Sequence, residues 1–229
     1  MRPYVIIKAA VSFNGCLDDE TPKRRIFSNE QDLAAVDELR ASCDAILVGA
    51  GTVRKDNPRL LLRSDELRRA RINKNLIPDP WKVTLTASGN LDPASNFFLA
   101  GKTKKLVYAS SISAPSAMQK LGPGTEVVAV GEKRTAVTEM LADLHKRGVR
   151  RLLVEGGSIM LERFLSQGLL DEFRLAISGD VISSAGAACL RLNSAIALTP
   201  SLLKVTRLGE LCVLNYIFAG RADSSGCPA

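Results

Sequence analysis

Two adjacent glycines give the segment Glu155-Gly156-Gly157-Ser158 the character of an anion-binding turn. An apolar run at residues 151–154 precedes it, and a stretch with helical spacing follows. Free backbone amides at the start of a helix, together with the positive end of its dipole, bind phosphate groups. Glu155 would stand at the carboxyl end of a strand, where open α/β sheets bind ligands. The pattern favours a binding site over the alternative, a tight strand-to-helix turn with a solvated glutamate.

A second glycine-containing turn, Gly49-Ala50-Gly51-Thr52, follows another apolar run. Its glycines would let backbone amides approach a ligand closely. Thr52 and Asp56 lie four residues apart and would share one face of a helical turn. The three spaced glycines of a dinucleotide fingerprint are absent. The spacing therefore leaves two interpretations open, a ligand site and a plain turn after a strand.

Several basic residues are candidates for meeting an anionic ligand. Lys8 lies inside an apolar run at residues 5–11, where an unpaired ammonium is costly to bury. It either reaches the edge of its strand or meets an acidic partner or an anionic ligand. Arginine forks bind phosphate bidentately, so two of them converging on one site would suit a sugar phosphate. The candidates are Arg24, Arg25, Arg40, Arg59 and Arg63, although any single one is more simply a solvated surface residue.

The elements that must position these residues follow from hydrophobic periodicity. Short apolar runs predict strands at residues 5–11, 45–48, 82–86, 106–109, 125–130, 151–154 and 173–177. Helical spacing predicts a helix after a capping box of Ser28 and Gln31, with Leu33, Val36 and Leu39 at helical intervals. Further helices are expected at residues 138–147 and after Ser158, and residues 67–75 are helical or irregular. Alternating strands and helices predict an α/β fold with a mainly parallel, mixed sheet and an antiparallel pair around Leu208-Gly209 at its C-terminal edge.

The composition limits the class of protein to which the chain can belong. The chain has 229 residues, 46% of them hydrophobic, which predicts one domain over residues 1–219 and a disordered polar tail at 220–229. The net charge of +7 attracts anions, but 5% aromatic content offers little surface for stacking bases, so a small phosphorylated ligand is expected rather than nucleic acid. No apolar stretch is long enough to span a membrane, and the N-terminus lacks a signal sequence, which predicts a cytoplasmic protein.

Cysteine and histidine usage narrows the chemistry further. The five cysteines are widely spaced with no Cys-x-x-Cys pair, and reduced thiols are the simplest expectation. With His145 as the single histidine, the sequence argues against a metal cluster and against a Ser-His-Asp triad.

Five blocks of sequence occur together in a recognisable order. They are Lys8 with Ser12-Phe13-Asn14-Gly15, then Leu39-Arg40, the block from Asp44 to Leu60, Val154-Glu155-Gly156-Gly157, and Gly168-Leu169-Leu170-Asp171-Glu172. In these blocks the chain resembles the riboflavin-biosynthesis reductases, meaning the C-terminal domain of the bifunctional deaminase-reductases and their stand-alone archaeal and fungal relatives. The resemblance extends from about Arg2 to Phe218.

The resemblance implies a dihydrofolate-reductase-like fold, with helices on both faces of the sheet, a homodimer, and NADPH as the hydride donor. It implies a pyrimidine substrate carrying a ribosylamino 5-phosphate, which is reduced at C1′ to a ribitylamino product. By position, the cofactor contacts fall to Thr52, Asp56, Ser88, Gly156, Gly157 and Ser158. The substrate contacts fall to Arg24, Arg25, Arg40, Leu60 and Arg63, with Lys8 and Glu155 as the candidates for orienting the substrate or transferring a proton.

Some departures from the family pattern leave the substrate open. Asn14 stands where the family usually has Asp, and a basic insertion follows Arg63. The zinc-deaminase motifs are absent. These features admit a specialised reductase of a related pyrimidine or pterin as a second hypothesis. A nucleotide- or nucleic-acid-binding protein without catalysis, motivated by the positive charge, is a third, and the dispersed arginines argue against it.

Overall fold

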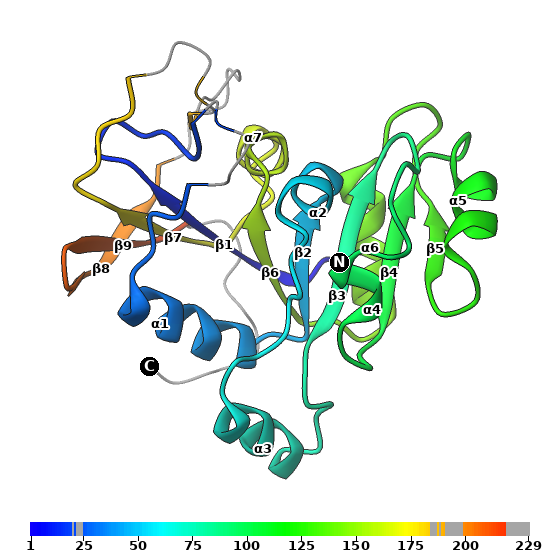
Figure 1. Ribbon diagram of the computed structural model, residues 1–229, viewed down its shortest axis with the longest axis horizontal. Helices are drawn as coiled ribbons and strands as arrows, with labels where there is room; N and C mark the ends of the chain where they lie inside the picture. The colour runs from blue at the N-terminus through cyan, green and yellow to red at the C-terminus, as the bar shows by residue number, and fades with distance from the viewer. Residues whose placement is uncertain (20, 22–24, 184–186, 188, 191–198, 219–229) are drawn as a thin grey trace.

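The computed structural model describes residues 1–229 apart from 20, 22–24, 184–186, 188, 191–198 and 219–229. Within the described residues, nine strands form one sheet in the order β5-β4-β3-β2-β6-β1-β7-β9-β8 (Figure 1). The parallel strands are β1 (Tyr4–Val11), β2 (Ala45–Gly49), β3 (Trp81–Thr86), β4 (Lys105–Ala109), β5 (Glu126–Ala129), β6 (Arg151–Gly156) and β7 (Glu172–Ile177). The central strands β2, β3, β4 and β6 are largely buried on both faces, as parallel strands require, whereas the edge strand β5 is partly exposed.

The sheet ends in an antiparallel edge. β9 (Leu211–Ile217) pairs with β7 on one side and with β8 (Ser201–Leu208) on the other. Gly209, with φ of +60°, takes the left-handed conformation in the turn between β8 and β9. The mainly parallel sheet and its antiparallel C-terminal edge are therefore confirmed.

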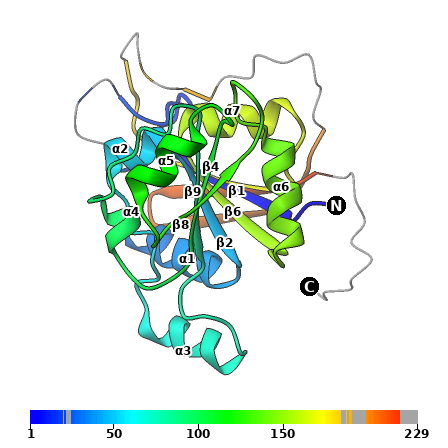
Figure 2. The ribbon, with the colours of Figure 1, turned by 90° about the vertical axis from the view of Figure 1, so that its right-hand side faces the viewer.

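Helices cover both faces of the sheet (Figure 2). On one face, α6 (Val137–Lys146) and α7 (Ser158–Ser166) bury their apolar side chains against the central strands. On the other face lie α1 (Glu30–Ala41), α2 (Ala50–Asp56), α4 (Asn96–Leu99) and α5 (Ala114–Leu121), and α3 (Asp65–Asn73) packs beside α1. The carboxyl ends of the parallel strands thus share one edge of the sheet with the starts of α2 and α7.

Helix α1 differs from its expected form in two ways. Its N-cap is Asn29, whose side chain accepts a hydrogen bond from the backbone N–H of Asp32, so the expected Ser28 capping box is wrong by one residue. Its buried residues are Asp32, Asp37 and Leu39, whereas Leu33 and Val36 are half-buried. A helix that buries two carboxylates must face polar partners, and those partners belong to the site below.

Candidate functional site

Strand β6 ends in a bulge that carries Glu155. Leu47 of β2 pairs with Val154, but the next residue, Val48, pairs with Gly156, so Glu155 has no partner on β2. A bulge of this kind re-aims a side chain and is common beside active sites. The side chain of Glu155 is accordingly turned toward α1.

The two glycine turns meet at this end of the sheet. Gly156 and Gly157 have φ of +130° and +83°, which L side chains rarely adopt, and Gly157 is the N-cap residue of α7. A Cβ added at Gly157 would lie 3.0 Å from Oγ1 of Thr52, in the first half of α2. The sequence segments around residues 52 and 157 therefore lie against each other, and a side chain at Gly157 would occupy the space between them.

The start of α7 presents backbone donors. A helix leaves the N–H groups of its first turn without intrahelical partners. Here the N–H groups of Met160 and Leu161 bond back to the carbonyl of Gly157. Those of Ser158 and Ile159 have no backbone acceptor in the described part of the chain. The turn thus offers amides and the positive end of the α7 dipole to an anion.

The turn after β3 lies beside α2. Arg54 of α2 donates to the carbonyl of Asn90 at 3.0 Å, and this joins α2 to the turn that contains Ser88. Ser88 is exposed, and its hydroxyl accepts from the N–H of Asn90. Asp56 is the last residue of α2, one turn after Thr52. The structure therefore brings the residues expected to contact a cofactor to one edge of the sheet.

Lys8 meets an acidic partner inside the protein. Its Nζ donates to Oδ2 of Asp32 at 2.6 Å, and the two side chains are 8% and 2% exposed. Of the alternatives that the sequence left open for Lys8, the structure shows the acidic partner. Sequence reasoning missed Asp32, although a buried lysine needs a carboxylate and α1 carries one at its third position.

Arg40 forms a bidentate ion pair with Glu155. Its Nε and Nη2 donate to the two carboxylate oxygens at 2.6 and 2.7 Å, and Nη1 donates to the carbonyl of Leu61 at 3.1 Å. Burial would lower the pKa of Arg40, but the charge and hydrogen bonds of Glu155 outweigh it and raise that pKa above its ordinary value. The fork expected to bind substrate is thus occupied by the neighbouring carboxylate.

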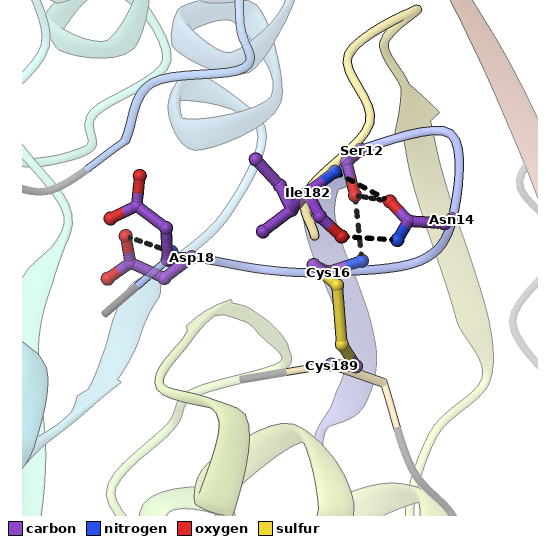
Figure 3. The surroundings of a disulfide bond; sticks show 7 residues. Ser12, Asn14, Cys16, Asp18, Ile182 and Cys189 are labelled. Carbon is purple, nitrogen blue, oxygen red and sulfur yellow. Dashed lines mark hydrogen bonds between the residues drawn. A yellow bond between two sulfur atoms is a disulfide. The ribbon is translucent and has the colours of Figure 1, made fainter. Parts of the chain in front are cut away.

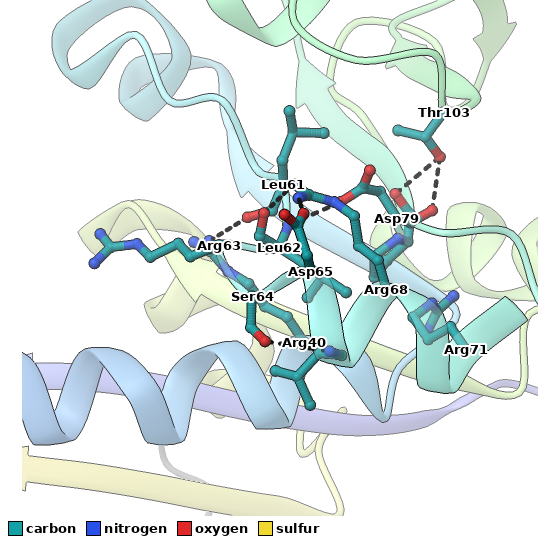
Figure 4. Close-up of polar contacts among 12 residues, drawn as sticks. Arg40, Leu61, Leu62, Arg63, Ser64, Asp65, Arg68, Arg71, Asp79 and Thr103 are labelled. Carbon is teal, nitrogen blue, oxygen red and sulfur yellow. Dashed lines mark hydrogen bonds and ion pairs between the residues drawn. The ribbon is translucent and has the colours of Figure 1, made fainter.

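The chain after α2 is held in place by Asp37. Both oxygens of this buried carboxylate accept from the N–H of Arg63, and one also accepts from the N–H of Ser64, at 2.9 Å each. Leu60, 3% exposed, adopts a left-handed φ of +47°, which is strained for a leucine. The Arg63 side chain is exposed and points away from the neighbouring residues Leu62 and Ser64 (Figure 4). Within the described residues its guanidinium has no hydrogen-bond partner.

The basic segment after Arg63 forms α3, and two of its arginines bind this chain itself. Arg71, 3% exposed, donates to the carbonyls of Ala41, Cys43 and Ile77 at 2.7 to 2.9 Å. Arg68 contacts Asp79 at 3.3 Å (Figure 4). Part of the positive charge that motivated the nucleic-acid hypothesis therefore fastens α3 to the end of α1.

Two loops at the carboxyl ends of β1 and β7 are bound to each other (Figure 3). Asn14 donates to the carbonyl of Ile182 at 2.7 Å and accepts from the N–H of the same residue at 3.0 Å. A disulfide joins Cys16 to Cys189, so the expectation of reduced thiols is wrong for this pair. The expectation failed because 173 residues separate two cysteines that the fold places in adjacent backbone segments.

Arg25 anchors the same region. Its Nη2 donates to Asp180 at 3.1 Å, and its side chain is 43% exposed. Nearby, Lys55 of α2 pairs with Asp18 at 2.5 Å. Arg24, the other arginine expected at a substrate phosphate, lies outside the described residues.

Known proteins are similar to this chain in sequence and in fold. The sequence profile of the RibD C-terminal domain matches residues 3–209. The chain belongs to the RibD C-terminal domain family. A 2,5-diamino-6-ribosylamino-4(3H)-pyrimidinone 5′-phosphate reductase of Archaeoglobus fulgidus is 35% identical over 92% of this chain and 95% of its own length. The enzyme of the same name from Methanothermobacter thermautotrophicus is 32% identical over 96% of this chain and 100% of its own length.

Solved structures show the fold of this RibD-type reductase. RibD of Acinetobacter baumannii superposes with a TM-score of 0.79 at 22% identity, covering 96% of this chain. The chain spans 59% of that longer RibD chain. A dihydrofolate reductase of Enterococcus faecalis, complexed with NADP(H), superposes with a TM-score of 0.51 at 12% identity, covering 95% of this chain and 97% of that chain.

The likeness at this level of identity shows the fold alone. It confirms the expected dihydrofolate-reductase-like architecture of the RibD-type reductase.

Two further features of the described residues bear on the class of site. No group of three or more His, Cys, Asp or Glu side chains within the described residues is placed to hold a metal ion. Among the same residues, no helix is both long enough and apolar enough to cross a membrane. What the described site does offer is a set of backbone donors at α7 and two ion pairs on α1, one buried and one partly buried, an arrangement suited to binding and orienting an anionic ligand.

Proposed function

We propose that this RibD-type reductase uses NADPH to reduce 2,5-diamino-6-ribosylamino-4(3H)-pyrimidinone 5′-phosphate to its ribitylamino counterpart. The observation that carries the proposal is the meeting of the two glycine turns, with Thr52 Oγ1 beside Gly157 at the start of α7. The choice of substrate is supported by the names of two relatives that match this chain over almost their whole length.

The residues present fit a nicotinamide dinucleotide. Nothing lies within 4 Å of a Cβ built at Gly156, so the turn has open space on that side, and the α7 amides border it. The diphosphate would be held by the backbone of Gly156, Gly157 and Ser158. Thr52, Asp56 and Ser88, on the same edge of the sheet, would contact the rest of the cofactor. NADPH supplies the hydride when it is bound.

The substrate side is built from Lys8 and Glu155. Reduction at C1′ of the opened sugar needs no protein nucleophile, because positioning and local charge supply most of the help. The Lys8 ammonium has three donors and gives one to Asp32, so it would offer the others to substrate oxygens. Glu155, aimed by the bulge, would orient the sugar chain or pass a proton. Leu60 would pack against the pyrimidine.

The substrate phosphate would lie at the exposed arginines. Arg63 has its backbone fixed by Asp37 while its guanidinium is exposed, which leaves the fork available for an anion. Arg25, held by Asp180, would approach from the loop side, together with Arg24. Arg40, which is occupied by Glu155, would reach the substrate through that carboxylate rather than directly.

NADPH oxidation by the purified protein tests the proposal. The diamino substrate and its deaminated analogue are offered separately, and absorbance at the nicotinamide band is followed. Turnover of the diamino compound is expected. Tight NADPH binding with no turnover of either pyrimidine would contradict the proposed substrate, and a related pyrimidine or pterin would then be proposed in its place. Failure to bind NADPH would contradict the proposal that NADPH is the cofactor.

The proposal also includes a homodimer that works in the cytoplasm, with residues 1–219 as one catalytic unit. β8 is an outer edge of the sheet, and it exposes Leu202, Leu203 and Val205 by 52%, 67% and 56%. Apolar side chains on an unpaired edge strand invite pairing with another chain. Light scattering should give twice the chain mass, and Leu203→Lys should lower it. A monomer at micromolar concentration would contradict the dimer.

A further inference from the structure

Helix α1 supplies the opposite charge for both residues nominated for catalysis. Asp32 accepts from Lys8 at 2.6 Å, and eight residues later Arg40 holds Glu155 through bonds of 2.6 and 2.7 Å. Lys8 and Glu155 lie on neighbouring strands, because the residues that precede them are register partners. A single helix thus fixes two opposite charges on the neighbouring strands β1 and β6.

We propose that Asp32 and Arg40 are positioning residues that act through Lys8 and Glu155. The proposal rests on the roles proposed above for those two side chains. A lysine has a flexible four-carbon stem, so its ammonium needs a fixed partner to occupy one place. A bidentate arginine fixes both the position and the plane of a carboxylate.

The carboxylate of Asp32 is not needed to cap its own helix. An acidic residue in the first turn usually serves the exposed helix end, but Asn29 already accepts from the N–H of Asp32. Asp32 is instead 1% exposed and turned toward the sheet. Since a buried carboxylate requires a partner, its contact with Lys8 accounts for its burial. Arg40 likewise gives its fork to Glu155 and a third N–H to the carbonyl of Leu61, so three of its five donors serve to hold it in place.

A double-mutant cycle on the full chain tests the action of Asp32 through Lys8. Asp32→Asn should lower kcat at least 30-fold while the Kd for NADPH stays within twofold. Asp32→Glu, which keeps the charge, should recover part of that loss. Lys8→Met should also lower kcat, and adding Asp32→Asn to it should cost less than a further threefold. A single Asp32→Asn variant with kcat within threefold of wild type would overturn the proposal. It would also be overturned if the fold-loss of kcat in the double variant equalled the product of the fold-losses in the two single variants.

Arg40→Lys is the second arm, useful if Asp32→Asn does not fold. It keeps the positive charge but loses the bidentate contact, so kcat should fall at least tenfold with NADPH affinity unchanged. An unchanged kcat would contradict the role of Arg40. The matched control is Asp65→Asn on α3, whose carboxylate is 74% exposed and pairs with Arg68 away from Glu155. This variant should behave as wild type in every assay.

A measurement without turnover separates this proposal from the proposed function. In a 1H–15N spectrum of lysine side chains, the buried Lys8 ammonium should give a slowly exchanging signal. That signal should shift or vanish in Asp32→Asn and stay in Asp65→Asn. If wild type reduces neither pyrimidine yet Lys8 responds in this way, the substrate is wrong and the positioning contact stands. An unchanged Lys8 signal in Asp32→Asn would overturn the contact itself.

Discussion

The two parts of the site are built by different means. On the α1 side, charged groups are paired, Lys8 with Asp32 in a buried pair and Arg40 with Glu155 in a partly buried one, and a third carboxylate holds two backbone amides. On the side of the glycine turns, the main feature is the backbone itself, with positive φ at Gly156 and Gly157 and the first N–H groups of α7 directly after them. Side chains fixed in advance suit a substrate that must be oriented for reaction. Backbone donors suit a diphosphate, whose charge needs binding but no chemistry.

The largest expected effect comes from closing the glycine side. Gly157→Val places a branched side chain at φ of +83° and a Cβ 3.0 Å from Thr52 Oγ1. The Kd for NADPH, measured by fluorescence titration, should rise more than about 100-fold, because the α7 amides are displaced. Gly124→Val is the control, since a Cβ there meets nothing within 4 Å. An unchanged Kd in a folded Gly157→Val protein would refute the cofactor site.

Reduction of the Cys16–Cys189 disulfide should weaken the loops that follow β1 and β7. A native disulfide contributes roughly 2–4 kcal/mol, so dithiothreitol should lower the melting temperature by about 5–10 °C. Cys16→Ser should melt at the reduced value with or without the reductant. Cys212→Ser, at an exposed free thiol, should respond to dithiothreitol as wild type does. Equal melting temperatures in both redox states would show that the bond adds no stability.

Replacing Arg71 tests how firmly α3 is fastened to α1. Arg71→Met keeps the apolar stem but leaves three carbonyls without their donor. The free energy of unfolding in urea should fall by about 2 kcal/mol, with NADPH affinity unchanged. Arg69→Met, at an exposed position of the same helix, should change it by less than about 0.5 kcal/mol. Equal effects of the two substitutions would contradict a special role for Arg71.

The smallest effect is expected at Asn14. Asn14→Asp keeps the acceptor for Ile182 N–H but loses the donor to Ile182 O and brings a carboxylate against that carbonyl. The KM for substrate should rise a few-fold at neutral pH, for a loss of about 1 kcal/mol. Protonation restores a donor, so the penalty should shrink as the pH falls toward about 4. A penalty that is independent of pH would rule out this explanation.

The strands could be predicted from the sequence because parallel strands bury continuous apolar runs. The same approach failed at the buried face of α1, where Asp32 and Asp37 replace the apolar residues that periodicity expects. These carboxylates are buried because of partners on β1 and after α2, which a local pattern does not contain. The resemblance to the reductase family identified Lys8 and Glu155 as candidate site residues. Their ion-pair partners could be identified only from the three-dimensional contacts.

Two other features could not be predicted because the residues in contact lie far apart in the sequence. Arg71 was one of many basic residues in an insertion, and its three carbonyl partners lie on different segments. Cys16 and Cys189 meet because β1 and β7 are neighbours in the sheet, although 173 residues separate them. Composition and spacing carry no information on either contact.

The disulfide also changes how the chain would come apart when it is cut. It closes a covalent ring that contains β2 to β7, while β1, β8 and β9 are attached to the ring as open ends. A protease that cleaves once inside the ring yields two pieces that still migrate together on a gel without reductant. A cut before Cys16 or after Cys189 releases a fragment under the same conditions. The central strand β1 is therefore a part of the sheet that a single cut can free, although its neighbours β6 and β7 both belong to the ring.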